Sequence, residues 1–183
     1  MSRLTIPARD EAPAESQPLL DGVFKKLGVV PNLFRIFAQS PAALGGLLGL
    51  VGANSKMLDV KTRERIAIAV AQVNGCDYCL SAHTYIGTKL AKITPEDAAL
   101  NRRGASTDAK AAAAVGFAAK VAKLRGQVSN DDIAAVKTAG YSEAQVVEIV
   151  AIVAENVMTN YLNNVADTDI DIDFPVVQTA AAA

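Results

Sequence analysis

The stretch NGCDYCLSAHTYIG, residues 74–87, contains both cysteines of the 183-residue chain and its only histidine. Cys76 and Cys79 form a CxxC motif, and His83 follows four residues after Cys79. Because positions three and four apart share one face of a helix, a helix here places Cys79 and His83 one turn apart. Gly75 precedes the motif and puts Cys76 at or near the N-terminus of that helix. The clustering predicts thiol redox chemistry.

The helix position and the neighbouring base favour different sulfurs as the nucleophile. Free backbone N–H groups and the helix dipole favour a thiolate at Cys76, which we also expect to be exposed. A base within hydrogen-bond reach favours Cys79, because only this sulfur lies one turn from His83. Spacing prefers Cys79 but leaves both assignments open.

Glu64 is a candidate third partner. It lies twelve residues before Cys76, in the segment KTRERIAIAVAQVNG, whose other face is apolar. If this helix packs antiparallel to the next, the carboxylate can approach His83, orient the imidazole and raise its basicity. The alternative is that Glu64 pairs with a neighbouring Lys or Arg on a solvated face.

Two further interpretations of the cluster remain open at this level. A zinc ion could use Cys76, Cys79, His83 and Glu64, although structural zinc sites are usually richer in Cys and His and the chain has no second CxxC. The cysteines could also be inert core residues at helical spacing. The nearby histidine argues against inert packing, and the small number of Cys and His residues argues against zinc. The chain also has no GxGxxG after a strand to bind a flavin or a nicotinamide, so we predict no metal ion and no cofactor.

The rest of the chain predicts an all-α protein, a compact bundle of roughly seven to eight helices. Thr94-Pro95, SNDD from Ser129 and SEAQ from Ser142 are typical helix starts, and no segment has the alternation of a β-hairpin. We expect an N-terminal arm over 1–18, a single helical domain over 19–175 with its redox core at about 40–125, and a C-terminal tail over 176–183. The segment 143–162 is apolar around much of its circumference, which indicates burial in the core or against another subunit.

Composition excludes several classes of function. Eighteen basic and nineteen acidic residues give a formal charge of −1, and no basic run exceeds two residues, so nucleic-acid binding is not expected. The first eighteen residues lack the apolar region of a secretory signal, and the apolar run at 42–53 is too short to span a bilayer. We therefore expect a cytoplasmic protein without membrane contact, where a permanent disulfide is unusual.

The pattern of Glu64, Cys76, Cys79 and His83 resembles the active site of the alkyl hydroperoxidase D and carboxymuconolactone decarboxylase superfamily, most closely its peroxidase-related branch. The segments GVVPNLFRIFAQSPAAL (28–44) and NYLNNVADTDIDIDFP (160–175) are similar to that branch as well. Decarboxylase-type members lack the CxxC. The namesake hydroperoxidases have a histidine between the cysteines, where this chain has Tyr78.

This resemblance implies an alkyl hydroperoxidase D-like helical fold in a homo-oligomer, a trimer or a hexamer. It also implies that Cys79 attacks a peroxide, that Cys76 resolves the sulfenic acid as a disulfide, and that His83 relays the proton with Glu64 behind it. The expected activity is a thiol-dependent peroxidase for hydrogen peroxide or small organic hydroperoxides in antioxidant defence. An external dithiol, a lipoyl group or a thioredoxin-like protein, would reduce the disulfide. The alternative is a redox adaptor or sensor that uses the same CxxC for disulfide exchange.

Overall fold

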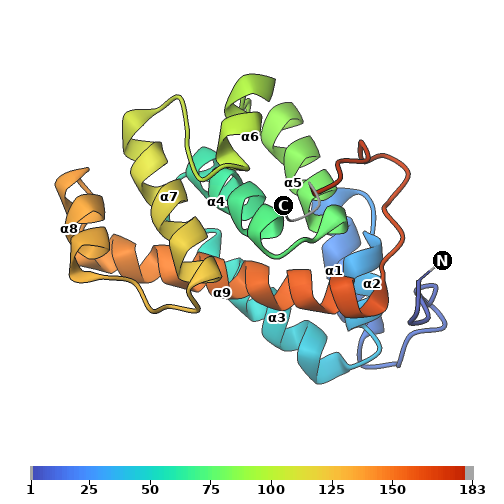
Figure 1. Cartoon of the computed structure of the whole chain (residues 1–183). Coiled ribbons are helices and arrows are strands. Elements are labelled where there is room, and N and C mark those ends of the chain that lie inside the picture. The colour runs from blue at the N-terminus through green and yellow to red at the C-terminus, as the bar shows by residue number, and fades with distance from the viewer. Residues whose placement is uncertain (1, 180–183) are drawn as a thin grey trace.

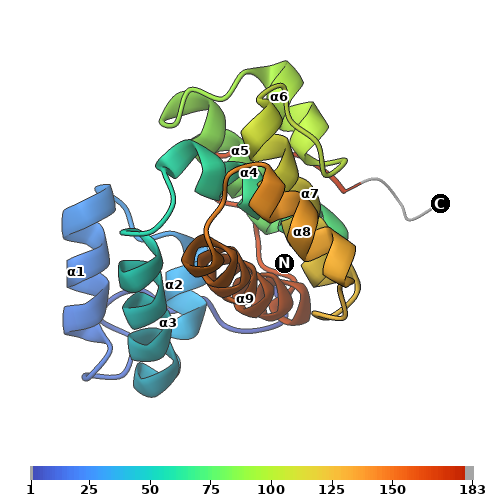
Figure 2. The same ribbon diagram turned by 90° about the vertical axis from the view of Figure 1, so that its left-hand side faces the viewer.

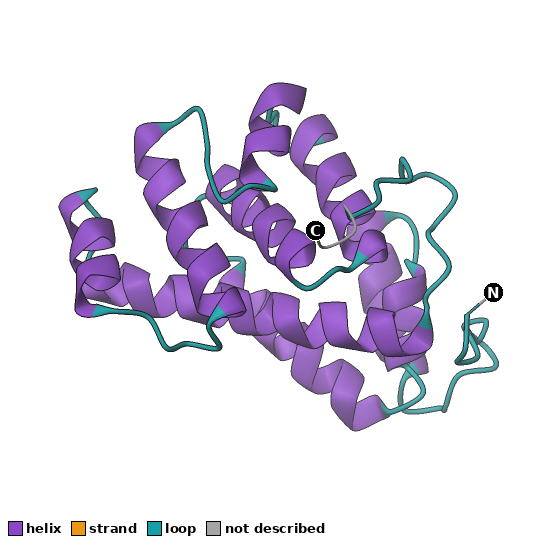
Figure 3. Ribbon diagram, in the orientation of Figure 1, coloured by secondary structure: helices purple, strands orange, loops and turns teal. Residues whose placement is uncertain are grey.

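The protein is all-helical in the computed structural model, which describes residues 2–179 (Figure 3). Within this range there are nine α-helices and no strand, so the predicted class is confirmed. The helix count exceeds the expected seven to eight. Two of the helices are short, α2 (Asn32–Phe37) and α6 (Pro95–Asn101). The others are α1 (Gln17–Leu27), α3 (Pro41–Asn54), α4 (Val60–Val73), α5 (Asp77–Lys89), α7 (Ala109–Lys123), α8 (Asn130–Thr138) and α9 (Glu143–Ala166).

Helix α9 runs through the length of the molecule and divides it. Figures 1 and 2 show α1–α3 on one side of this helix and α4–α8 on the other. Ile149, Ile152 and Val153 are buried in the core, whereas Val147 and Val165 lie exposed on the outer face. The apolar circumference of α9 is therefore only partly used inside this chain, and the homo-oligomer stays a prediction.

Helix α4 is the centre of the α4–α8 half. The six residues from Ile66 to Ala71 are all buried, and the helix packs against α5, α6, α7 and α9. A helix that is apolar all round requires neighbours on every side. Its two flanking charged residues, Glu64 and Arg65, are therefore held close to the core and need partners there.

Capping side chains set the helix starts, as the sequence predicts. The Asp59 side chain accepts a hydrogen bond from the backbone N–H of Thr62 at the start of α4. Thr94 caps α6, with Pro95 in its first turn. Both predicted capping boxes are present, at Ser129 and at Ser142.

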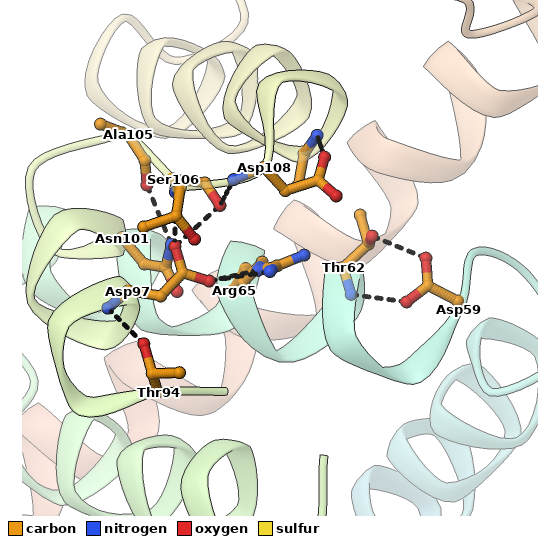
Figure 4. A network of polar contacts seen from close by, with 11 residues as sticks. Asp59, Thr62, Arg65, Thr94, Asp97, Asn101, Ala105, Ser106 and Asp108 are labelled. Carbon is orange, nitrogen blue, oxygen red and sulfur yellow. Dashed lines mark hydrogen bonds and ion pairs between the residues drawn. The ribbon is translucent and has the colours of Figure 1, made fainter. Parts of the chain in front are cut away.

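A buried ion pair fixes the rotation of α4 about its axis (Figure 4). Arg65 Nε and Nη2 both lie 2.8 Å from Asp97 Oδ2 on α6. The other oxygen of Asp97 accepts hydrogen bonds of 2.8 Å from the Ser106 hydroxyl and from the Thr107 backbone N–H, in the loop before α7. Burial alone would raise the pKa of Asp97, but these hydrogen bonds and the Arg65 charge lower it.

The N-terminal and C-terminal segments of the described residues lie against the helical body. Arg35 on α2 donates to the backbone carbonyls of Ile6 and Pro7, and Val177 exchanges hydrogen bonds with the Ser81 hydroxyl on α5. Residue 1 of the predicted arm and residues 180–183 of the predicted tail lie outside the described residues, and the domain boundaries stay predictions. None of the helices described is both long and apolar enough to cross a bilayer.

Replacing Asp97 with Asn should strongly destabilise the protein. The substitution keeps the side chain's size but leaves the Arg65 guanidinium buried without its counter-charge. We expect the free energy of unfolding to fall by about 3–5 kcal/mol, measured by urea denaturation. Asp21→Asn, which removes the exposed pair with Arg9, is the control and should cost far less. Similar losses in both variants would contradict this account.

Candidate active site

A tight turn between α4 and α5 places the CxxC motif. Gly75 follows the end of α4 with a φ of 63°, in the left-handed region that glycine adopts at little cost. The chain then re-enters a helix with Cys76 as the N-cap, whose Sγ accepts a hydrogen bond of 3.4 Å from the backbone N–H of Cys79. Cys76 thus precedes the first turn, as expected, and Cys79 lies within it.

Both sulfurs are buried, so the expected exposure of Cys76 is wrong. The exposed fraction is 0% for Cys76 and 2% for Cys79, and both thiols are free. The two residues belong to an apolar cluster with Ile68 and Leu80, against which residues of the C-terminal segment also pack. A helix N-terminus is often solvated, but the antiparallel packing of α4 on α5 and the returning chain end cover this one.

The polar surroundings favour Cys79 as the thiolate. Burial alone would raise its pKa, but a hydrogen bond from the Cys76 thiol, the charge of His83 and side-chain amides from α9 lower it. The nearest amide is Asn163, whose Nδ2 lies 3.1 Å from the Cys79 sulfur. The hydrogen bond with Cys79 and burial raise the pKa of Cys76. Cys79 is therefore the more acidic of the two thiols.

His83 and Glu64 form a close pair between α5 and α4. The distance from His83 Nδ1 to Glu64 Oε2 is 2.8 Å. Burial opposes a charged imidazole, but Glu64 raises the pKa of His83 to about 9. The alternative of a solvated pair is wrong, because Arg63 donates to the Leu58 carbonyl and Arg65 binds Asp97 instead. The structure thus brings together Glu64, Cys76, Cys79 and His83.

A small cavity of about 170 Å³ reaches this pair, with lining residues from α3, α4, α5 and α9. It exposes 24% of the His83 side chain and 14% of the Glu64 side chain. Glu155 of α9 also lines it and accepts a hydrogen bond of 2.6 Å from Asn54. Burial raises the pKa of Glu155. The imidazole therefore borders a cavity that also contains the carboxyl group of Glu155.

Tyr78, between the two cysteines, contacts α2 and the C-terminal segment. Its hydroxyl donates to Asp171 at 2.5 Å and accepts from the backbone N–H of Leu33 at 3.1 Å. Its ring contacts Phe174 edge to face. Where the namesake hydroperoxidases have a histidine, this chain therefore has a residue that binds the C-terminal segment to α5.

The zinc alternative has no arrangement of side chains to support it. Across residues 2–179, no group of three or more His, Cys, Asp or Glu side chains is placed to hold a metal ion.

Sequence analysis missed the asparagines of α9. Asn160 and Asn163 are 0% and 2% exposed, and both act on Cys79. A signal was available, because asparagine is unfavourable in a helix interior unless its side chain has a specific partner. Asn156, Asn160 and Asn163 recur at helical spacing on the face that also carries Ile149, Ile152 and Val153.

The fold and the site define an all-helical protein with two unequal thiols beside a histidine–carboxylate pair. The sequence model of the carboxymuconolactone decarboxylase family matches residues 38–124. An uncharacterized protein of Haemophilus influenzae is 53% identical over 36 residues, which is 20% of this chain and 32% of that protein. The chain thus matches only about a third of the length of that curated relative.

Solved structures are similar over nearly the full chain. A peroxidase-related protein with an alkylhydroperoxidase AhpD core, from Ralstonia eutropha JMP134, is 25% identical with a TM-score of 0.82, covering 94% of this chain and 93% of that one. A peroxidase-related protein from Silicibacter sp. TM1040 is 24% identical with a TM-score of 0.81 and the same coverage. The debrominase Bmp8 is 22% identical with a TM-score of 0.78, covering 93% of this chain and 92% of that one. The last two likenesses show the fold alone.

The family match over residues 38–124 and the similarity to the AhpD-core structure support the alkyl hydroperoxidase D and carboxymuconolactone decarboxylase superfamily for this chain. The catalytic roles of Glu64, Cys76, Cys79 and His83 stay predictions.

Replacing Glu64 with Gln should lower the pKa of His83 by about one unit or more, because the nearby negative charge is lost. His83 is the only histidine, so NMR titration of its ring Cε1–H reports this value without ambiguity. Glu143→Gln, at an exposed position, should leave the titration near 9. An unchanged titration in the Glu64 variant would show that another group sets the charge of His83.

The same pair predicts a pH-dependent difference in stability. The folded pKa of His83, about 9, lies above its unfolded value of 6.5, so the stabilisation from its charge is complete below pH 6.5 and is lost as pH rises through 9. We expect the wild type to exceed the Glu64→Gln variant in unfolding free energy most at pH 6, and least above pH 9. Urea denaturation across this range measures the difference, and a constant difference would contradict the assignment.

Proposed function

We propose that the protein is a thiol-dependent peroxidase for hydrogen peroxide or small organic hydroperoxides. The observation that carries this proposal is the position of Cys79, which accepts a hydrogen bond of 3.1 Å from Asn163 and lies beside the His83–Glu64 pair. These surroundings lower the pKa of Cys79, whereas the hydrogen bond with Cys79 and burial raise that of Cys76. Since a thiolate is the form that attacks peroxides, Cys79 is the nucleophile and Cys76 the resolving thiol.

His83 takes the proton of Cys79 and is held as imidazolium by Glu64, 2.8 Å away. The Cys79 thiolate attacks the terminal oxygen of the hydroperoxide, so that an S–O bond forms and the O–O bond breaks. The departing alkoxide or hydroxide takes the proton from His83. The products are Cys79 sulfenic acid and an alcohol or water.

The second step forms a disulfide between the two cysteines. The Cys76 sulfur attacks the Cys79 sulfur, an S–S bond forms, and the sulfenic oxygen leaves as water with the Cys76 proton. An external dithiol then reduces the disulfide by exchange. We propose a lipoyl group or a thioredoxin-like protein as this reductant, in a reducing compartment that agrees with the predicted cytoplasmic location and with a role in antioxidant defence.

The histidine–carboxylate pair beside Cys79 favours this enzyme over a redox adaptor. Cleavage of a peroxide needs a proton for the departing alkoxide or hydroxide, and His83, 2.8 Å from Glu64, can supply it. Disulfide exchange alone releases no such oxygen anion. The proposed homo-oligomer is supported by the exposed apolar residues on the outer face of α9, Val147, Val150, Tyr161 and Val165.

Cys79→Ser should abolish peroxide consumption, whereas Cys76→Ser should retain a single oxidation that stops at the sulfenic acid. Dimedone labelling followed by peptide mass spectrometry locates the trapped sulfenic acid. We expect the label on Cys79 of the Cys76→Ser variant. A label on Cys76 of the Cys79→Ser variant, formed at the wild-type rate, would reverse the two roles.

The pre-reduced wild type should lose its two thiols to stoichiometric tert-butyl hydroperoxide far faster than free cysteine does. Intact-mass analysis should show loss of two hydrogens, as expected for a Cys76–Cys79 disulfide. Turnover with a dithiol donor at low protein concentration then completes the test. A rate equal to that of free cysteine, with rapid exchange with a protein disulfide, would favour the adaptor.

A further inference from the structure

Two buried asparagines of α9 lie beside the Cys79 sulfur. Asn160 is 0% exposed and Asn163 is 2% exposed. Asn163 Nδ2 donates to Cys79 Sγ at 3.1 Å, and the nearby Asn160 amide, which completes no hydrogen bond with the sulfur, also lowers the pKa of Cys79. Cys79 therefore has one amide donor from α9 and a second amide close by.

The orientation of Asn160 is fixed from the turn after α4. Asn74 Nδ2 donates to Asn160 Oδ1 at 2.9 Å, and Asn164 Nδ2 in turn donates to the Asn74 carbonyl at 2.9 Å. With its oxygen held by Asn74, Asn160 has its Nδ2 left as the free end of the amide. The same turn that positions Cys76 thus orients a donor group beside Cys79.

Each of the two amides has one unused polar atom. Asn160 Nδ2 and Asn163 Oδ1 are buried and complete no hydrogen bond with any described residue. Buried polar groups in proteins are normally satisfied, because an unpaired one pays the cost of leaving water. A free donor and a free acceptor on neighbouring side chains match one hydroxyl group, which accepts one hydrogen bond and donates another.

We propose that Asn160 and Asn163 form the binding site for the oxygen atom that a peroxide transfers to Cys79. Asn160 Nδ2 donates to this oxygen, and Asn163 Oδ1 accepts its O–H. Since the oxygen comes from the substrate of the proposed peroxidase, the site rests on that proposed function. The two asparagines are positioning residues for the attack and hold the sulfenic acid until Cys76 resolves it.

The proposed amide site binds the transferred oxygen atom until this oxygen leaves as water. Before attack, the terminal –OH of the hydroperoxide occupies the amide pair, in line with the sulfur. After attack, the same oxygen is bonded to Cys79 as S–OH and keeps both hydrogen bonds. When the Cys76 sulfur forms the disulfide, the oxygen departs as water with the Cys76 proton. The amides neither gain nor lose a proton in any step.

The test uses the full-length Cys76→Ser protein, in which Cys79 is the only thiol. Asn163→Leu and Asn160→Leu remove the amides at similar volume. Thr159→Val is the matched control, because its hydroxyl bonds the Asn156 carbonyl of the same helix. Two quantities are measured: the pH profile of Cys79 alkylation by iodoacetamide, and the rate of sulfenic acid formation with hydrogen peroxide at a pH where Cys79 is fully ionised in every variant.

We expect Asn163→Leu to raise the alkylation pKa of Cys79 by about one unit or more, because a donor to the thiolate is lost. At full ionisation, both asparagine variants should form sulfenic acid at least about tenfold more slowly than the parent. Thr159→Val should change neither quantity. A purely structural role would alter melting temperatures without slowing a fully ionised Cys79.

A second measurement needs no asparagine substitution and covers variants that fail to fold. Peroxide treatment of the Cys76→Ser protein should shift the side-chain amide NMR signals of Asn160 and Asn163, and leave Asn101 on α6 unchanged. Fast oxidation of the parent with unshifted amides, or with equal rates in the variants, would overturn the oxygen site alone. A parent that peroxide does not oxidise would overturn the proposed function together with this site.

Discussion

The hydrogen bond of 2.8 Å between His83 Nδ1 and Glu64 Oε2 joins the two helices that carry the site. It forms only when α4 and α5 are antiparallel and α4 is rotated to turn Glu64 toward its neighbour. The next residue, Arg65, binds Asp97 of α6 on another side of α4. Because a buried charge is costly without a partner, these two consecutive residues restrict α4 to one rotation. The position of the imidazole is thus part of the packing of the core.

Glu64, His83 and Cys79 form a row of alternating negative and positive charges that ends at the resolving thiol, Cys76. Glu64 stabilises the His83 imidazolium, the imidazolium lowers the pKa of Cys79, and the thiolate raises that of Cys76. In a buried site each of these interactions is stronger than in water. Two chemically identical thiols three residues apart therefore differ in ionisation. The hydrogen bond from the Cys76 thiol and the charge of His83 together lower the pKa of Cys79, so the more acidic thiol is the one beside the imidazole and not the one at the helix N-cap.

Local sequence patterns were sufficient for the helices and for the centre of the site. The boxes at Ser129 and Ser142 form within one turn, and the spacing of Cys79 and His83 is itself a helical turn. Contacts between distant segments could not be predicted in this way: Asn163 lies 84 positions from Cys79, and Asp97 lies 32 from Arg65. The burial of Cys76 was missed for the same reason, because its cover comes from the end of the chain. The approach of Glu64 to His83 was predictable only as one of two outcomes, since antiparallel packing is a tertiary property.

The burial of the α9 asparagines and the burial of the two thiols have the same physical cause, the packing of α9 through the middle of the molecule. A helix that crosses the whole molecule must be apolar to bury its inner face, and each asparagine on that face loses solvation that an apolar residue would not. That cost is partly offset at Asn163 by the Cys79 sulfur and at Asn160 by Asn74. Exclusion of water strengthens these neutral donors, so Cys79 is stabilised as an anion with a single cationic neighbour, His83. Burial also restricts access to the Cys79 sulfur. A small reactant that donates and accepts hydrogen bonds through one hydroxyl group therefore fits this environment better than a charged or bulky one.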